Sequence, residues 1–135
     1  MSLDGRFNID VVIHDIDGTS QLNVLSLEST DAASSTAKAA LVTGTIGTQV
    51  VYISRQPIPY TAADGTSVSF SFVERVALRG NPHVELTTNA LGQRYFASNN
   101  RVGLYEMTGS ERTNTTFALR TTTGTATYSL LVYGS

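Results

Sequence analysis

The residues with the clearest potential for chemistry stand together near the N-terminus. An apolar run, Val11-Val12-Ile13, leads into His14-Asp15-Ile16-Asp17-Gly18-Thr19. Imidazole and carboxylate groups at this spacing can ligate a metal ion, which makes His14, Asp15 and Asp17 candidate ligands. The structural alternative is a turn, because Asp-Gly is a favoured pair in the tight turn of a β-hairpin. The sequence favours the hairpin turn.

The same string, Asp15-x-Asp17-Gly18-Thr19 after an apolar run, resembles the first motif of the haloacid dehalogenase-like phosphatases. The resemblance implies that Asp15 is a nucleophile for a phosphoryl group and Asp17 a general acid/base, with Mg²⁺ nearby. That family also uses a later lysine and a downstream acidic pair, because the developing charge must be neutralised. Here the only lysine is Lys38, and the only aspartate after Asp31 is Asp64. We therefore predict no catalytic residue, no metal site, no cofactor and no enzymatic activity.

The remaining ionisable residues are spread thinly along the chain. His83 follows Pro82 where a strand is expected to begin, and we expect it at a surface or an interface. The neighbours Glu74-Arg75 and Glu111-Arg112 point to opposite faces of an extended chain. We expect both pairs to be ordinary surface residues.

The composition excludes several classes of function. Charged residues make up 15% of the chain, against about 25% in a typical globular domain, and the formal net charge is −2. The eight arginines are scattered, so we expect neither nucleic acid nor an anionic membrane as partner. Without cysteine there is no disulfide framework and no thiolate metal site. Tyr95, Phe96 and Tyr105 could stack on sugars or bases, but their alternating positions favour burial in the core or an interface.

The length and the apolar segments indicate one domain. The chain has 135 residues, which is enough to bury a core of its own. No apolar run approaches the roughly 20 residues that span a bilayer. Residues 1–6 have neither the basic nor the apolar region of a signal peptide, so we expect synthesis in a cytoplasm.

Alternation of apolar and polar residues predicts an all-β fold. Phe7, Ile9, Val11 and Ile13 alternate with mostly polar residues, and a turn at residues 17–20 predicts a hairpin with residues 22–27. Residues 31–40 are expected to be a loop, with one helical turn as the alternative. Two prolines predict an extended surface loop at residues 55–60. Further strands are expected at residues 37–43, 49–53, 68–72, 84–88, 94–97, 102–107, 116–120 and 126–133.

These segments indicate a single antiparallel β-sandwich, or a jelly-roll or barrel-like domain, of roughly nine or ten strands. We place the domain at residues 9–135 and an N-terminal arm at residues 1–8. The final strand, at residues 126–133, is apolar on both faces near its end, which predicts a central or covered position.

Two segments rich in Thr, Gly and small residues lead to a second resemblance, residues 41–48 (LVTGTIGT) and 121–135 (TTTGTATYSLLVYGS). In these the chain resembles the small all-β structural proteins of tailed-bacteriophage virions, the capsid decoration or cement proteins first and tail or fibre components next. The resemblance implies a non-enzymatic protein of the virion, assembled in the host cytoplasm. Such a protein binds the outer capsid surface, often as a homotrimer, and holds the major capsid protein subunits together.

Assembly of this kind needs complementary surfaces rather than reactive side chains. The candidate contact residues are Leu3 and Phe7 in the arm, together with Ile58, Pro59 and Tyr60. Docking of these residues onto the domain's own core is the alternative. A rival function is a carbohydrate-binding or receptor-binding module, which would use exposed aromatic side chains with polar partners.

Overall fold

The computed structural model describes residues 3–14, 21–34, 37–54, 58–61, 67–88, 94–113 and 116–135. Within these residues the regular structure consists of twelve β-strands and one short 3-10 helix, which confirms the all-β class. The described part of the chain holds no helix that is long and apolar enough to cross a membrane. The chain divides into two compact units, Met1–Ala37 and Lys38–Ser135.

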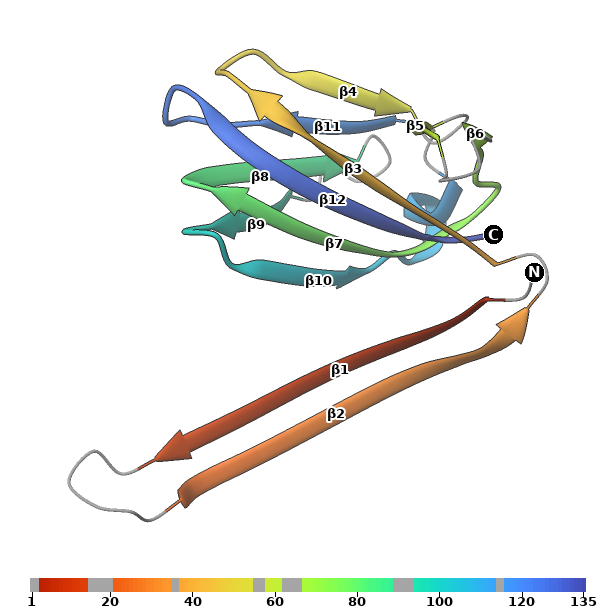
Figure 1. The fold of residues 1–135 in the computed structure, drawn as a ribbon, viewed down its shortest axis with the longest axis vertical. Coiled ribbons are helices and arrows are strands. Elements are labelled where there is room, and N and C mark those ends of the chain that lie inside the picture. Colours follow the sequence, from red (N-terminus) through yellow and green to blue (C-terminus); the bar gives the residue numbers. More distant parts are fainter. Residues whose placement is uncertain are drawn as a thin grey trace. The chain divides into compact units, whose positions relative to one another are not determined.

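The first unit is a long antiparallel hairpin of β1 (Leu3–His14) and β2 (Gln21–Ser34), as the alternation predicts (Figure 1). In its register Ile9 lies opposite Leu27 and Val11 opposite Leu25. The expected turn at residues 17–20 lies outside the described residues. The expected arm boundary at residue 8 falls within β1, whereas the compact units divide after Ala37.

The loop or helical turn expected at residues 31–40 is wrong over its first part. β2 continues to Ser34 because its backbone pairs with the start of β1, where Gly5 lies opposite Asp31 and Leu3 opposite Ser34. The small residues of this segment have low strand propensity, but the ladder satisfies their backbone groups. Residues 35 and 36 lie outside the described residues.

The second unit is a sandwich of two four-stranded antiparallel sheets, which lie face to face in Figure 1. The first sheet has the order β10 (Val102–Glu106), β7 (Val73–Asn81), β12 (Ala126–Gly134), β3 (Lys38–Ile46). The second has the order β4 (Val51–Ser54), β11 (Thr116–Arg120), β8 (His83–Thr88), β9 (Arg94–Ser98).

The hydrophobic core lies between these sheets, and alternate residues of most strands contribute to it. The partly exposed Tyr95, Tyr105 and Tyr128 pack against it. The large side chains that are fully buried in it are Ile53, Phe70, Val73, Val76, Leu78, Val84, Leu86, Phe117, Leu119 and Leu130. The outer faces of the two sheets, which point away from this core, therefore carry residues that are available to bind other molecules.

β12 occupies a central position, as its apolar character on both faces predicts. It pairs with β3 on one side and with β7 on the other along nearly its whole length. At its end the Ser135 amide donates to the Phe72 carbonyl at 2.8 Å, and the Ser71 and Phe72 amides donate to the Ser135 carbonyl at 2.6 and 2.9 Å. These bonds tie the end of β12 to the segment that precedes β7.

The expected surface loop at residues 55–60 is wrong for its second half. Ile58–Thr61 form β5, which pairs with β6 (Ser67–Val68) as a two-stranded sheet. Pro59 is tolerated because it lies in the irregular stretch between the paired residues Ile58 and Thr61, where no ladder amide is required. The segment between β10 and β11 contains the 3-10 helix η1 (Gly109–Thr113).

Candidate functional site

The candidate site is on the outer face of the β4-β11-β8-β9 sheet and is centred on Glu85. In β8 the buried side chains of Val84 and Leu86 face the core, so Glu85 between them faces outward. The register places Arg120 of β11 opposite Glu85 on one side and Phe96 of β9 opposite it on the other. Glu85 nevertheless retains only 7% of its surface exposed, because its neighbours cover it.

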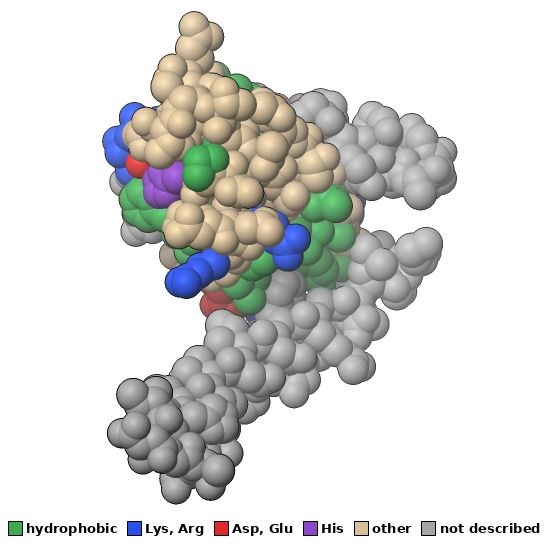
Figure 2. All heavy atoms as spheres, turned by 60° about the vertical axis from the view of Figure 1, so that its left-hand side comes forward, with side chains coloured by type: hydrophobic (Ala, Val, Ile, Leu, Met, Phe, Trp, Pro, Cys, Tyr) green, Lys and Arg blue, Asp and Glu red, His purple; other side chains and the backbone are tan. Residues whose placement is uncertain are grey.

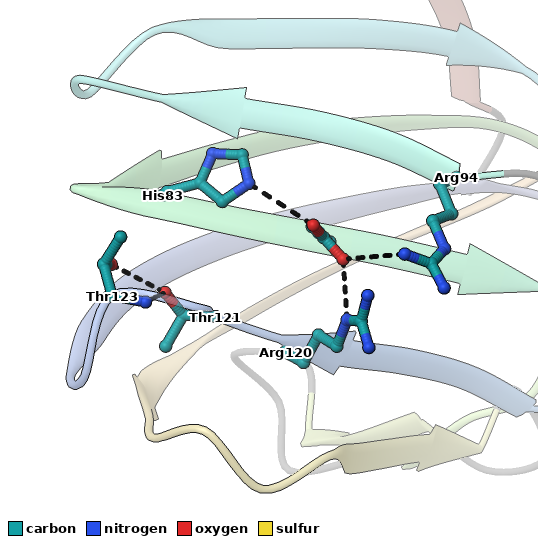
Figure 3. A network of polar contacts seen from close by, with 6 residues as sticks. His83, Arg94, Arg120, Thr121 and Thr123 are labelled. Atoms are coloured by element: carbon teal, nitrogen blue, oxygen red, sulfur yellow. Dashed lines mark hydrogen bonds and ion pairs between the residues drawn. The ribbon is translucent and has the colours of Figure 1, made fainter.

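Three cationic or titratable side chains converge on the Glu85 carboxylate (Figure 3). Arg120 donates from Nε to Oε2 at 2.6 Å, and an Arg94 terminal nitrogen lies 3.6 Å from the same oxygen. His83 Nε2 lies 3.6 Å from Oε1. We call His83, Glu85, Arg94, Phe96 and Arg120 the Glu85 cluster.

The electrostatics of this cluster favour an ionised carboxylate. The hydrogen bond from Arg120 holds the pKa of Glu85 below its ordinary value of 4.5, with further lowering by Arg94 and His83, although burial acts in the opposite direction. Two guanidinium groups, which stay protonated at any ordinary pH, share this single carboxylate. The Glu85 cluster therefore carries a surplus of positive charge at neutral pH.

Aromatic rings flank the charged groups on the same sheet face. The Phe96 ring stacks on His83, with 5.9 Å between ring centroids and 27° between planes, and Phe96 remains 50% exposed. Tyr52 of β4, which is 68% exposed, lies opposite the outward-facing Ala118 of β11. Figure 2 shows a histidine side chain at the surface beside acidic, basic and hydrophobic side chains. Phe96 is therefore not buried in the core, so of its two expected positions only the interface remains a prediction, whereas Tyr95 and Tyr105 do pack against the core.

The loop after β11 is also held by side-chain contacts, drawn in Figure 3. The Thr121 and Thr123 hydroxyls are 2.9 Å apart, and the Thr123 amide donates to the Thr121 hydroxyl at 3.3 Å. Thr121 is buried and directly follows Arg120. These bonds fix the end of the strand that carries Arg120.

A second polar network is inside the sandwich and corrects one expectation. Glu111 of η1, expected at the surface, is only 1% exposed. Its Oε2 accepts a hydrogen bond from the Tyr95 hydroxyl at 2.6 Å and one from the Thr88 hydroxyl at 3.2 Å. Burial, followed by the Glu111 hydrogen bond, raises the pKa of Tyr95, so this phenol stays protonated and donates. The network joins η1 to β8 and β9 through hydrogen bonds from the Thr88 and Tyr95 hydroxyls to Glu111, so we assign it a structural role.

In each of the sequence neighbours Glu74-Arg75 and Glu111-Arg112, the two residues contact different partners. Glu74 forms an ion pair with Arg112, whose guanidinium lies 5.2 Å from the centre of the Phe72 ring. Arg75 pairs with Glu106 at 3.2 Å. These contacts fasten η1 and β10 to β7.

The outer face of the other four-stranded sheet carries an apolar groove. The groove has a volume of about 250 Å³ and lies over β3, β7, β10 and β12. Leu131 of β12 and Leu41 of β3 are opposite one another in the register, and both are partly exposed. The residues that line the groove are Leu41, Ala77, Arg79, Val102, Ser129 and Leu131.

The contact residues predicted from the sequence lie in two different compact units. Leu3 and Phe7 belong to β1 of the hairpin, and Ile58, Pro59 and Tyr60 belong to β5. Their side chains are outside the described part of the structure, so their contact role stays a prediction. None of them belongs to the Glu85 cluster.

The Asp15 and Asp17 motif lies outside the described residues, and His14 is the final residue of β1. Among the described side chains, no group of three or more His, Asp or Glu residues could hold a metal ion. The Glu85 cluster was missed because its members come from three strands. The alternation His83-x-Glu85-x-Thr87 indicates an outward polar row, but the partners of that row depend on strand order, which alternation does not reveal.

Comparisons with models of protein families, with curated proteins and with solved structures found no match to this chain.

Proposed function

We propose that the protein is a non-enzymatic structural component of a tailed-bacteriophage virion, a capsid decoration protein that binds the outer surface of the shell and stabilises it. Its partners are the major capsid protein and further copies of the same chain. One observation carries the proposal, namely the long β1–β2 hairpin that forms a compact unit separate from the sandwich.

The hairpin has the pattern of an element that needs a covering surface. The register pairs Ile9 with Leu27 and Val11 with Leu25 at successive alternate positions, which we call the apolar row of the hairpin. The alternate register positions pair Asn8 with Glu28 and Asp10 with Ser26, and then Val12 with Val24. A two-stranded hairpin is at best marginally stable in water without a further layer, and residues 3–14 and 21–34, the described strands of its unit, form only the hairpin itself. Contact between subunits of a shell is a natural source of that layer.

The sandwich adds surfaces that suit assembly. The apolar groove around Leu41, Val102 and Leu131 can accept protruding apolar side chains. The outer face of the other sheet exposes aromatic residues and arginine, the types that dominate binding energy at protein interfaces. Either surface can bind a partner protein by complementary contacts alone, without a reactive side chain.

The test is co-sedimentation with shells assembled from the major capsid protein of the same genome. We expect saturable binding and an increase in the temperature at which the shells break open. Leu27→Asp should weaken binding, because it introduces a charge into the apolar row of the hairpin. Thr30→Asp is the matched control, because it adds the same charge on the other face, opposite Arg6.

Binding that Thr30→Asp leaves intact and Leu27→Asp reduces supports the proposal. Absence of binding to empty and to DNA-filled shells contradicts it. Equal binding by both variants and the unsubstituted protein contradicts the role of the hairpin.

A further inference from the structure

The Glu85 cluster has features that assembly alone does not require. Its residues form a row across the outer face of the second sheet, Arg120, Glu85 and Phe96, at matched register positions on β11, β8 and β9. The adjacent row on that face runs from Tyr52 through Ala118 and Thr87 to Arg94. The two rows together make a platform with charge in the middle and an aromatic ring at each edge.

The arginines of this platform have unused donors. Glu85 engages Arg120 through Nε, and no other hydrogen bond of the Arg120 guanidinium is found within the described residues. The Arg94 side chain is 49% exposed and lies 3.6 Å from the shared carboxylate. A guanidinium offers five N–H donors in a planar fork that matches a carboxylate. The platform can therefore accept one further carboxylate without leaving Glu85 unpaired.

The aromatic rings suit a flat partner. Tyr52 and Phe96 lie on the two edge strands, three strand spacings apart, which corresponds to about 14 Å across the sheet. This span fits a short linear chain of sugar rings better than a single small ion. The C–H-rich face of a pyranose ring packs favourably on the electron-rich face of an aromatic ring.

We propose that this platform binds an acidic saccharide. Arg94 and Arg120 pair with the sugar carboxylate, Phe96 and Tyr52 contact ring faces, and the covered Glu85 carboxylate holds the two guanidinium groups in place. A nucleic acid fits less well, since its consecutive phosphates need a row of cations, whereas the platform has two arginines that already share one carboxylate. This binding activity is separate from the proposed stabilisation of a shell.

The experiment is a titration of the full-length ¹⁵N-labelled protein, followed by amide chemical shifts. The probes are a trimer of galacturonate and 3′-sialyllactose, and the neutral controls are maltotriose and lactose. We expect saturable shifts confined to amides of β4, β8, β9 and β11 with the acidic sugars, and binding about tenfold weaker or worse with the neutral ones.

Two substitutions separate the site from general charge effects. Arg94→Gln should weaken binding of the acidic sugar about tenfold, since Arg94 is half-exposed and its loss leaves the core intact. Arg79→Gln makes the same charge change beside the groove of the other sheet and should leave the affinity unchanged. Phe96→Ala should weaken acidic and neutral sugars alike.

The proposal is overturned if both acidic sugars give no saturable shift at tens of millimolar. It is also overturned if Arg94→Gln and Arg79→Gln have equal effects, or if an oligothymidylate probe binds the same amides more tightly than the sugars. Shell binding is measured separately, so either proposal can fail while the other stands.

Discussion

At the scale of single residues, Glu85 shows how packing changes the meaning of a surface position. It faces outward, yet only 7% of its surface is exposed, because Arg120, Arg94, His83 and Phe96 surround it. A covered carboxylate with two guanidinium partners gains from charge-assisted hydrogen bonds while the partly exposed arginines keep contact with water. Glu111, by contrast, is enclosed by the core and bonded to Tyr95 and Thr88.

The Glu85 contacts predict a pH-dependent stability. The pKa of Glu85 is lower in the folded protein than its ordinary value of 4.5, so its contribution is present above that value and is lost as the pH falls through the folded pKa. Glu85→Gln should lower the free energy of unfolding by about 1–3 kcal/mol at pH 7. The deficit should shrink when urea unfolding is repeated at pH values progressively below 4.5, because the unfolded chain then binds a proton that the folded protein takes up only at still lower pH.

Glu106→Gln is the matched control for that experiment. Glu106 also pairs with an arginine, Arg75, but its side chain is 64% exposed, so its removal should change stability by less than about 1 kcal/mol. A deficit for Glu85→Gln that stays constant between pH 7 and pH 3 would contradict the electrostatic account.

At the scale of elements, alternation in the sequence predicted most strands but not their neighbours. The strands at β8, β9, β10, β11 and β12 agree with expectation to within a few residues, since each has apolar residues at every second position. The central place of β12 followed from Leu130, Leu131 and Val132, which are apolar on both faces.

The features that were missed depend on long-range pairing. β2 extends to Ser34 because β1 is there to pair with it, and β5 forms around Pro59 because β6 offers a partner. The Glu85 cluster requires β9 and β11 to flank β8, an order that local sequence does not specify. The candidate site could therefore be predicted only as an outward polar row on one strand.

The end of β12 provides an element-scale prediction. A Cβ added at Gly134 would lie 2.0 Å from the Phe72 carbonyl oxygen, so Gly134→Ala must displace the backbone bonds between Ser135 and Phe72. We expect thermal unfolding to show a loss of about 2 kcal/mol or more. The control is Gly47→Ala, whose added Cβ has its nearest contact at 3.8 Å. A loss for Gly134→Ala no larger than for Gly47→Ala would show that β12 ends more loosely than described.

At the scale of the whole molecule, charge is divided unevenly between the compact units. Residues 1–37 contain one basic and six acidic residues, whereas residues 38–135 contain eight basic and five acidic residues. The hairpin unit therefore has a formal net charge of −5 and the sandwich unit one of +3. Opposite charge on two units of the same chain favours association of copies at low salt.

The proposed capsid decoration role predicts the mass in solution, and the division of charge predicts how that mass depends on salt. Light scattering coupled to size exclusion should give a homotrimer, three times the chain mass of 14.4 kDa. The trimer should dissociate at lower protein concentration when salt is raised from about 0.05 M to about 0.5 M, because screening weakens the attraction. A single-chain mass at every concentration and salt would contradict the trimer, and an insensitive trimer would contradict the electrostatic contribution.

The order of strands in the sandwich also constrains how the chain is made. β12 separates β3 from β7, and β11 separates β4 from β8, so each sheet is completed by a strand synthesised after most of its neighbours. While the ribosome is still translating residues 38–115, neither sheet can close, and the edges of β3, β7, β4 and β8 await partners. Nascent chains therefore depend on rapid completion or on chaperones. Slow codons just before residue 116 should reduce the soluble yield more than the same codons placed before residue 38, when no strand of the sandwich has been synthesised.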